Sequence, residues 1–183
     1  LYFKGLLQGD LGASFRYADW SVNDLVASAL PVSLSIGGIA MLLSALIGVA
    51  LGIGAALRQN SAVDYLVMML GNLGSAVPSF VMGPVLIIIF AIAFKWLPAG
   101  GWNAFDPRFM VLPIALLTII NVATIGRVMR GSLIEVMHSN FIRTARAKGL
   151  PARVVVLRHA LKPALLPVVS LMGPLAISSI TSA

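Results

Sequence analysis

The sequence predicts an all-α membrane protein, a polytopic helical bundle with about four transmembrane helices. Of its 183 residues, 59% are hydrophobic and only 10% are charged, and the mean hydropathy is +0.98. Soluble domains do not reach these values. Several uncharged runs approach or exceed the roughly 20 apolar residues that cross a bilayer. A strongly basic connector separates the last two runs.

The uncharged runs give the expected elements in order. Residues 1–28 are a more polar first segment, which we expect outside the bilayer, and residues 29–183 form one predicted transmembrane domain. The helices of this domain are expected over about 29–57, 65–95, 108–131 and 162–183. The connector between the last two covers about 132–161.

Small residues and prolines in the first two runs predict how these helices pack. Gly48 and Gly52 form a small-xxx-small pair, which permits close approach of another helix. Pro78 and Pro84 predict kinks in the second run, because proline removes a backbone hydrogen bond.

Polar side chains are few in the predicted helices, and no charge lies within the apolar runs proper. A proton-driven carrier is therefore disfavoured, since it would need ionisable groups at membrane depth. Asn72, Thr118 and Asn121 are candidates to face a translocation path. The alternative is that they form hydrogen bonds between helices, which is the more common role of such residues.

The distribution of lysine and arginine predicts the orientation. Eight of the 13 cluster around the connector, which carries one acid, Glu135, and these eight are Arg127, Arg130, Arg143, Arg146, Lys148, Arg153, Arg158 and Lys162. Short loops rich in such residues stay in the cytoplasm, so the connector is expected inside. Alternation then places residues 58–64 inside, and residues 95–108 and 1–28 outside.

The first half of the connector predicts a short amphipathic helix. Its apolar and small residues recur at helical spacing, and they are Phe141, Ile142, Ala145 and Gly149. Ser139 or Asn140 is the candidate N-cap. Gly149 followed by Leu150-Pro151 predicts the C-terminal stop.

A second amphipathic segment is expected from Ala152, with Val154, Leu157 and Leu161 on one side. From spacing alone the connector is a docking element for another protein, an ordinary basic loop, or an amphipathic helix on anionic lipid. The net charge of +7 makes nucleic-acid binding a further alternative to consider. No nucleic-acid fold flanks its basic patch with apolar runs of this length, so no nucleic acid is expected.

RTARAKG, from Arg143 to Gly149, resembles the cytoplasmic signature of the inner-membrane permease subunits of binding-protein-dependent ABC importers. That signature usually reads Glu-Ala-Ala, three variable residues and Gly. Ala145 and Gly149 match it, whereas Arg143 and Thr144 replace the Glu and the first Ala. TARAKGL, RHAL and ALLPV are typical of the oligopeptide and dipeptide permease branch. Further similar stretches are GDLGASFRY, VNDLVASALPVS, PSF, WLPAGGW and IEVMHSNFIRTARAKGLP.

The resemblance implies the fold of a type I ABC importer permease, of which this chain is a part. One helix would precede Leu1 and roughly the last quarter of the permease would follow Ala183. It also implies a coupling helix that fits a groove on an ATPase, formed by Asn140, Phe141, Ile142, Arg143, Thr144, Ala145, Arg146, Ala147, Lys148 and Gly149. Its cations would meet acceptor groups in that groove, and Phe141 and Ile142 would fill its apolar floor.

The function that the resemblance implies is uptake of oligopeptides across the bacterial inner membrane by a multi-pass permease subunit. The expected partners are a second homologous permease, two ATPase subunits, membrane lipid and the peptide. A periplasmic or extracellular substrate-binding protein would dock on the periplasmic segment 1–28 and on the WLPAGGW loop. Alternatives are an importer of nickel, glutathione or another small solute, and a passive channel or scaffold subunit.

No chemistry of its own is expected from this chain. It has no Gly-rich phosphate loop that ends in Lys-Ser or Lys-Thr, so ATP and magnesium would be bound by the ATPase subunits. His138 and His159 lie in a basic connector whose one acid is Glu135, and the sequence has no cysteine, which disfavours a metal site. We therefore expect no catalytic residue, no bound cofactor and no enzyme activity.

Overall fold

The computed structural model describes residues 6–17, 19–103 and 106–182, and these residues form helices and loops without a β-sheet. The all-α prediction is confirmed. The helices are α2 (Val22–Leu57), α3 (Ala62–Ala76), α4 (Ser79–Leu86), η1 (Ile87–Ala93), α5 (Arg108–Met137), α6 (Asn140–Ala147), α7 (Ala152–Val154), η2 (Val155–Ala160), α8 (Leu161–Ala164) and α9 (Leu166–Ser182). The segments η1 and η2 are π-helices.

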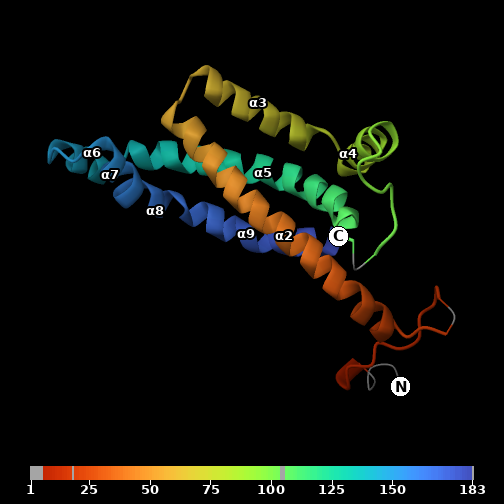
Figure 1. Cartoon of the computed structure of the whole chain (residues 1–183). Helices are drawn as coiled ribbons and strands as arrows, with labels where there is room; N and C mark the ends of the chain where they lie inside the picture. The colour runs from red at the N-terminus through yellow and green to blue at the C-terminus, as the bar shows by residue number, and fades with distance from the viewer. Residues whose placement is uncertain (1–5, 18, 104–105, 183) are drawn as a thin grey trace.

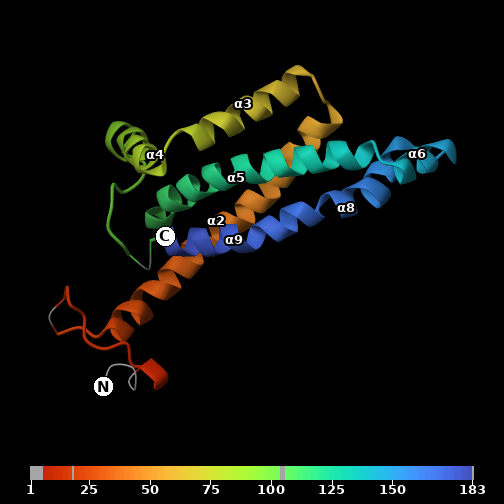
Figure 2. The same ribbon diagram turned by 180° about the vertical axis from the view of Figure 1, so that it is seen from behind.

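The arrangement places the two ends of the bundle far apart (Figure 1). α5 and α9 lie side by side, α2 crosses them, and α3 runs along α5. The view from behind shows the same order (Figure 2). α6 and the α2–α3 turn lie toward one end, whereas the N-terminal segment and the loop before α5 lie toward the other. The segments expected inside and those expected outside are thus separated as the charge pattern requires.

α2 begins at Val22 rather than at residue 29, because a capping box starts it there. The Asp24 N–H donates to Ser21 Oγ at 3.1 Å, and the Ser21 N–H donates to Asp24 Oδ2 at 3.3 Å. The 36 residues of the helix span about 54 Å, more than the roughly 30 Å of a hydrocarbon core. α2 is therefore longer than a perpendicular span requires, and tilt or projection beyond the hydrocarbon core accommodates the excess.

The second expected run, residues 65–95, is not one continuous helix. It breaks at Val77-Pro78, and the two arms are bent by 98°. Proline disfavours the helical conformation in the residue before it, and Val77 accordingly is extended, with φ −82° and ψ 120°. The kink expected at Pro78 is therefore a full break. Pro84 lies inside α4, just before the π-helical η1.

The last two predicted helices also differ from expectation at their ends. α5 begins at Arg108, as predicted, but runs on to Met137 instead of residue 131. The final run bends by 45° between residues 152–164 and 166–182, so it is not straight over 162–183. Pro167, at the start of α9, has no N–H for the carbonyl four residues before it, which weakens the helix there.

The spans can be counted from length and apolarity. Within the described residues, α2 and α5 are each long and apolar enough to cross a bilayer alone. Four spans result if each of the two bent pairs counts as one. The chain is thus a membrane protein, and many large apolar side chains on α2 and α3 are exposed, as a lipid-facing or partner-facing surface requires.

The centre of the bundle is the contact between α2 and α5. A Cβ added at Gly52 would lie 2.7 Å from the Gly126 carbonyl oxygen and 2.7 Å from Met129 Cβ. One added at Gly48 would lie 2.9 Å from Ile125 Cβ. The predicted small-xxx-small pair is therefore confirmed as a helix-packing site.

We expect Gly52→Ala to lower the free energy of unfolding by about 1–3 kcal/mol, because the added methyl group overpacks this contact. Denaturant titration of the protein purified in detergent measures the change. Gly54→Ala is the matched control, since nothing lies within 4 Å of a Cβ at Gly54. There the better helix propensity of alanine should leave stability unchanged or raise it by up to about 1 kcal/mol. Equal effects of both substitutions would contradict the packing assignment.

Candidate functional site at the basic end

The predicted coupling helix follows α5 after a two-residue turn. Ser139 has an extended backbone, with φ −68° and ψ 156°, and is the N-cap of α6. Its side chain does not cap the helix but donates to the Val136 carbonyl at 2.6 Å. Of the two candidate N-caps, Ser139 is therefore the one that the structure uses. The short turn leaves α6 directly attached to the end of α5.

α6 ends at Ala147 with Lys148 as its C-cap, and the stop that the sequence predicts at Gly149 follows directly. The Gly149 N–H donates to the Arg146 carbonyl at 2.9 Å, and Gly149 has φ +75°. This left-handed conformation suits glycine and strains other residues. Because nothing lies within 4 Å of a Cβ built there, the need for glycine comes from the backbone and not from crowding.

One face of α6 is buried against the rest of the chain. Ile142 is 0% exposed and Ala145 is nearly so, and both belong to the hydrophobic core that includes Leu133, Val155 and Ala160. The expectation that Ile142 fills an apolar floor on an ATPase is therefore wrong. Its spacing predicts an apolar face correctly, but this face holds α6 onto its own bundle.

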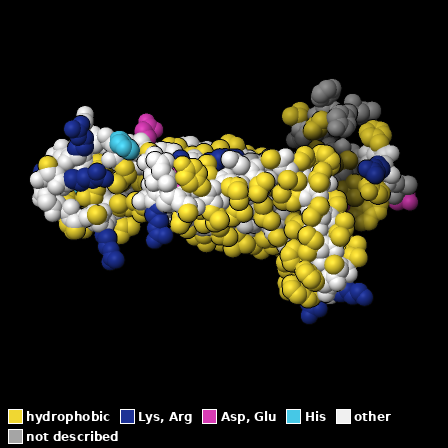
Figure 3. Space-filling view, turned by 90° about the horizontal axis from the view of Figure 1, so that it is seen from above, with side chains coloured by type: hydrophobic (Ala, Val, Ile, Leu, Met, Phe, Trp, Pro, Cys, Tyr) yellow, Lys and Arg dark blue, Asp and Glu magenta, His cyan; other side chains and the backbone are white. Residues whose placement is uncertain are grey.

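The other face of α6 is exposed and basic. Phe141 is 50% exposed, and the remaining exposed residues are Asn140, Arg143, Thr144, Arg146, Ala147, Lys148 and Gly149. In the part of the chain that the structure describes, none of its cations forms an ion pair with an acidic side chain. Lys and Arg side chains gather at this end of the molecule (Figure 3). The face thus presents positive charge and one aromatic ring to the surroundings.

The second half of the connector supports α6 with different residues than expected. Val155, Ala160 and Ala164 are buried, whereas Leu157, predicted on the apolar side, is 68% exposed. The physical reason is the π-helix η2, in which hydrogen bonds join residues five apart. Val155 and Ala160 are five apart and share the buried side. Of the residues predicted on the apolar side, Leu161 does pack against the core, so the α-helical period is wrong at Leu157 and misses the buried Val155 and Ala160.

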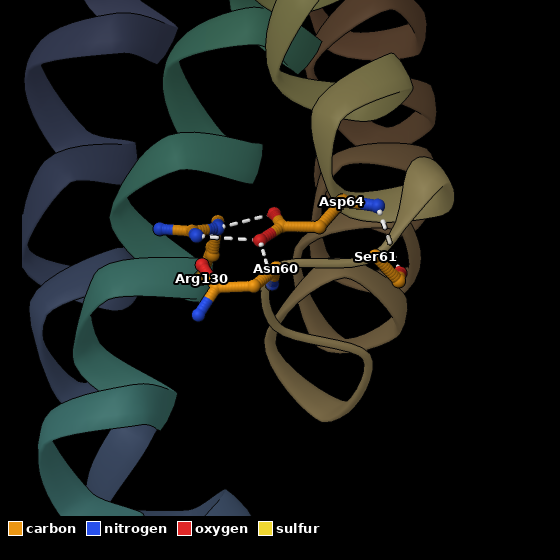
Figure 4. A network of polar contacts seen from close by, with 4 residues as sticks. All are labelled: Asn60, Ser61, Asp64 and Arg130. Carbon is orange, nitrogen blue, oxygen red and sulfur yellow. Dashed lines mark hydrogen bonds and ion pairs between the residues drawn. The ribbon is translucent and has the colours of Figure 1, made fainter.

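An ion pair beside this end was missed by sequence reasoning (Figure 4). Arg130 Nε lies 2.5 Å from Asp64 Oδ1, and Arg130 Nη2 lies 2.6 Å from Asp64 Oδ2. The Asp64 side chain is 2% exposed and that of Arg130 is 24% exposed. The Asn60 N–H also donates to Asp64 Oδ2 at 2.9 Å. The sequence signal that could have indicated this pair is Asp64 itself, an acid at the start of an apolar run. A buried carboxylate needs a cationic partner.

The three candidates for a translocation path lie in different surroundings. Asn121 Nδ2 donates to Ser179 Oγ of α9 at 2.8 Å, and Thr118 Oγ1 donates to the Ala40 carbonyl of α2 at 3.5 Å. Both side chains are buried, and they make the interhelical hydrogen bonds of the alternative interpretation. Asn72 is exposed, and its Oδ1 accepts from Arg127 Nη1 at 3.2 Å.

Asn121 nevertheless borders open space. It lines a cavity of about 290 Å³ between α3, α4, α5 and α9, together with Ser79, Ser178, Ser179 and Ser182. A role of these residues in a translocation path remains a prediction. Within the described ranges, no group of three or more His, Cys, Asp or Glu side chains could hold a metal ion.

Comparison with known proteins gives consistent matches. The family model for the binding-protein-dependent transport system inner membrane component matches residues 48–183. The oligopeptide transport system permease protein OppB of Escherichia coli (strain K12) is 57% identical over 180 residues, which cover 98% of this chain and 59% of OppB. OppB of Haemophilus influenzae (strain ATCC 51907 / DSM 11121 / KW20 / Rd) is 55% identical over 181 residues, 99% of this chain and 59% of that protein.

A more distant relative is the dipeptide transport system permease protein DppB of Bacillus subtilis (strain 168). It is 39% identical over 180 residues, which cover 98% of this chain and 58% of DppB. The chain thus spans slightly less than three fifths of the length of these curated relatives.

We expect Ile142→Ala to loosen α6 from the bundle, because truncating a fully buried isoleucine costs about 2–5 kcal/mol. Amide hydrogen exchange over residues 140–149 should become at least tenfold faster, which corresponds to a loss of about 1.4 kcal/mol. Phe141→Ala, at the exposed neighbour, is the control and should leave exchange nearly unchanged. Protection that stays at the level of the unmodified protein in Ile142→Ala would show that this side chain does not anchor α6.

Proposed function

This chain belongs to the family of binding-protein-dependent transport system inner membrane components, and on that basis we propose that it is a permease subunit of an ATP-driven oligopeptide importer. The single observation that best supports the proposal is the construction of α6. Two apolar side chains seat it on the bundle, and its free face carries three exposed cations next to an exposed aromatic ring. Such a face suits docking to a soluble protein.

The proposed energy source is a pair of separate ATPase subunits, which would bind ATP and magnesium. This chain would not be an enzyme and would bind no cofactor of its own. The α6 face would lie in a groove on one ATPase, with Arg143, Arg146 and Lys148 near acceptor groups and Phe141 against apolar side chains. Closure of the ATPase pair would then move α6 together with the helices to which it is packed.

The remaining proposed partners are a second permease subunit, a substrate-binding protein and the lipids of the bacterial inner membrane. The substrate-binding protein would dock at the end of the bundle opposite α6. There the N-terminal segment exposes Phe15, Tyr17 and Trp20, and the loop before α5 exposes Trp96 and Trp102. Aromatic side chains of this kind are frequent anchors at protein interfaces.

The proposed substrate is a short peptide, because the relatives carry the names of oligopeptide and dipeptide permeases. Nickel, glutathione and other small solutes receive no support from these names. A passive channel or scaffold would not need a basic helix held in place on the bundle. ATP-driven uptake of peptide is therefore the function that we propose.

Reversing the charge of the α6 face should weaken the complex with the ATPase. For Arg143→Glu/Arg146→Glu in the full-length subunit, we expect at least tenfold weaker association, or about 1.4 kcal/mol, because repulsion replaces attraction. Surface plasmon resonance in detergent measures the affinity, and affinity of the unmodified subunit should fall as salt is raised. Arg108→Glu, an exposed cation at the other end of α5, is the control. Unchanged affinity in the double variant would argue against docking by this face.

Transport itself is tested with the full-length subunit reconstituted in lipid with its neighbouring permease, ATPases and binding protein. Peptides of two to five residues should stimulate ATP hydrolysis and accumulate inside the vesicles. Chelated nickel should do neither. Stimulation of ATP hydrolysis by nickel alone would support the importer mechanism but with nickel, and not peptide, as the substrate. Peptide flux without ATP hydrolysis would favour the passive channel.

A further inference from the structure

α3 differs from the other long helices in how it is attached. The described hydrophobic core is built from side chains of α2, α5, α6, η2, α8 and α9, and no residue of α3 belongs to it. Between α3 and the pair α2–α5 lies an apolar groove of about 390 Å³, lined by Ile47, Leu66, Leu70, Val122 and neighbouring residues. Apolar packing of α3 against the bundle is thus interrupted by this groove.

Polar contacts to α5 also hold α3. The bidentate pair of Asp64 and Arg130 joins the first turn of α3 to α5. Farther along, Arg127 Nη1 donates to the Gly71 carbonyl at 3.4 Å and to Asn72 Oδ1 at 3.2 Å. Arg127 and Arg130 are three residues apart and therefore lie on one side of α5.

The Asp64 end of α3 is also fixed by its own turn. The Asp64 N–H donates to Ser61 Oγ at 3.4 Å, and Asn60, with φ 61°, directs its N–H to the same carboxylate that Arg130 binds (Figure 4). A guanidinium that meets a carboxylate with two parallel bonds fixes orientation as well as distance. The start of α3 is therefore held at a set distance and in a set orientation relative to α5.

α6 is attached to the same part of α5 as the ion pair. Leu133 lies three residues beyond Arg130 on α5, is fully buried, and shares the core with Ile142 of α6. The last turns of α5 thus carry α6 through apolar contacts and α3 through the ion pair. A displacement of α6 moves Arg130 with it, because one continuous helix, α5, holds both contacts.

We propose that Asp64 and Arg130 are positioning residues that make α3, and the bent segment α4–η1 beyond it, follow α5 when α6 is moved. The proposal rests on the proposed function, since it assumes that α6 receives the movement of an ATPase. Loss of the pair would leave ATP hydrolysis running while α3 no longer follows. The pair then determines how much peptide is imported per ATP.

The first test uses Asp64→Asn in the reconstituted full-length complex, with ATP hydrolysis and peptide uptake measured on the same vesicles. Asparagine keeps the size of the side chain and removes its charge. We expect uptake per ATP to fall at least tenfold, with hydrolysis changed by no more than about twofold. Arg130→Lys, which keeps the charge but loses the two-bond geometry, should give an intermediate ratio. Glu135→Gln, an exposed acid near the same end of α5, is the control and should keep the ratio unchanged.

A second test separates coupling from folding by comparing two halves of one sample. Residues 1–183 contain no cysteine, and any cysteine elsewhere in the full-length subunit is replaced by serine. Asp64→Cys/Arg130→Cys is reconstituted with cysteine-free partners, and one sample is divided and treated with or without a short bifunctional thiol cross-linker. Without the cross-link, hydrolysis should continue with little uptake. The cross-link replaces the ion pair with a covalent link. Uptake per ATP should therefore return to at least about half of the value for the unmodified complex.

Several outcomes would overturn the proposal. They are a normal ratio of uptake to hydrolysis without the cross-link, a ratio that the cross-link does not restore, and a proportional fall of both activities in Asp64→Asn. If the complex fails to assemble even when cross-linked, the role of the Asp64–Arg130 pair would be in folding alone. If the unmodified complex shows no peptide-stimulated hydrolysis, the proposed function fails instead, and the two failures are distinguished.

Discussion

The close approach of α2 and α5 is the constraint on which the rest of the structure depends. At Gly48 and Gly52 even a methyl group would meet backbone or side-chain atoms of α5 at less than 3 Å. In a membrane, helices associate through such packing, since lipid supplies no hydrophobic driving force between them. This contact fixes α5, and α5 in turn carries α9 through Asn121, α6 through Leu133, and α3 through Arg130. One helix therefore organises the bundle.

The basic end divides its apolar and charged residues between two tasks. Ile142 and Ala145 of α6 are buried inside the chain, so the proposed ATPase partner would meet mainly the charges and Phe141. Charged surfaces set the rate and selectivity of encounter more than the final affinity. An interface of this composition forms and dissociates readily, which suits a partner that changes shape in a cycle. In the proposed assembly, attachment to the bundle and docking to the ATPase would thus use opposite faces of an eight-residue helix.

Features set by neighbouring residues were predictable from the sequence, whereas those set by tertiary contact were not. The start of α5, the stop at Gly149 and the glycine pair on α2 follow from local patterns. The break at Val77-Pro78 was underestimated, since a proline predicts a weak point but not the angle. The Asp64–Arg130 pair joins residues 66 positions apart, so it requires knowing that α3 lies beside α5.

The π-helical segment η2 has a consequence for the evolution of chain length in the connector. A π turn closes its hydrogen bond over one residue more than an α turn, so η2 accommodates an additional residue while the helices on either side keep their faces. Loss of one residue there would be absorbed by rewinding to α-helix. The same loss inside α9 would rotate all later residues by about 100° and turn Ser179 away from Asn121. Loss of a single residue is therefore expected to be tolerated at residues 155–160 and excluded from the helix that follows.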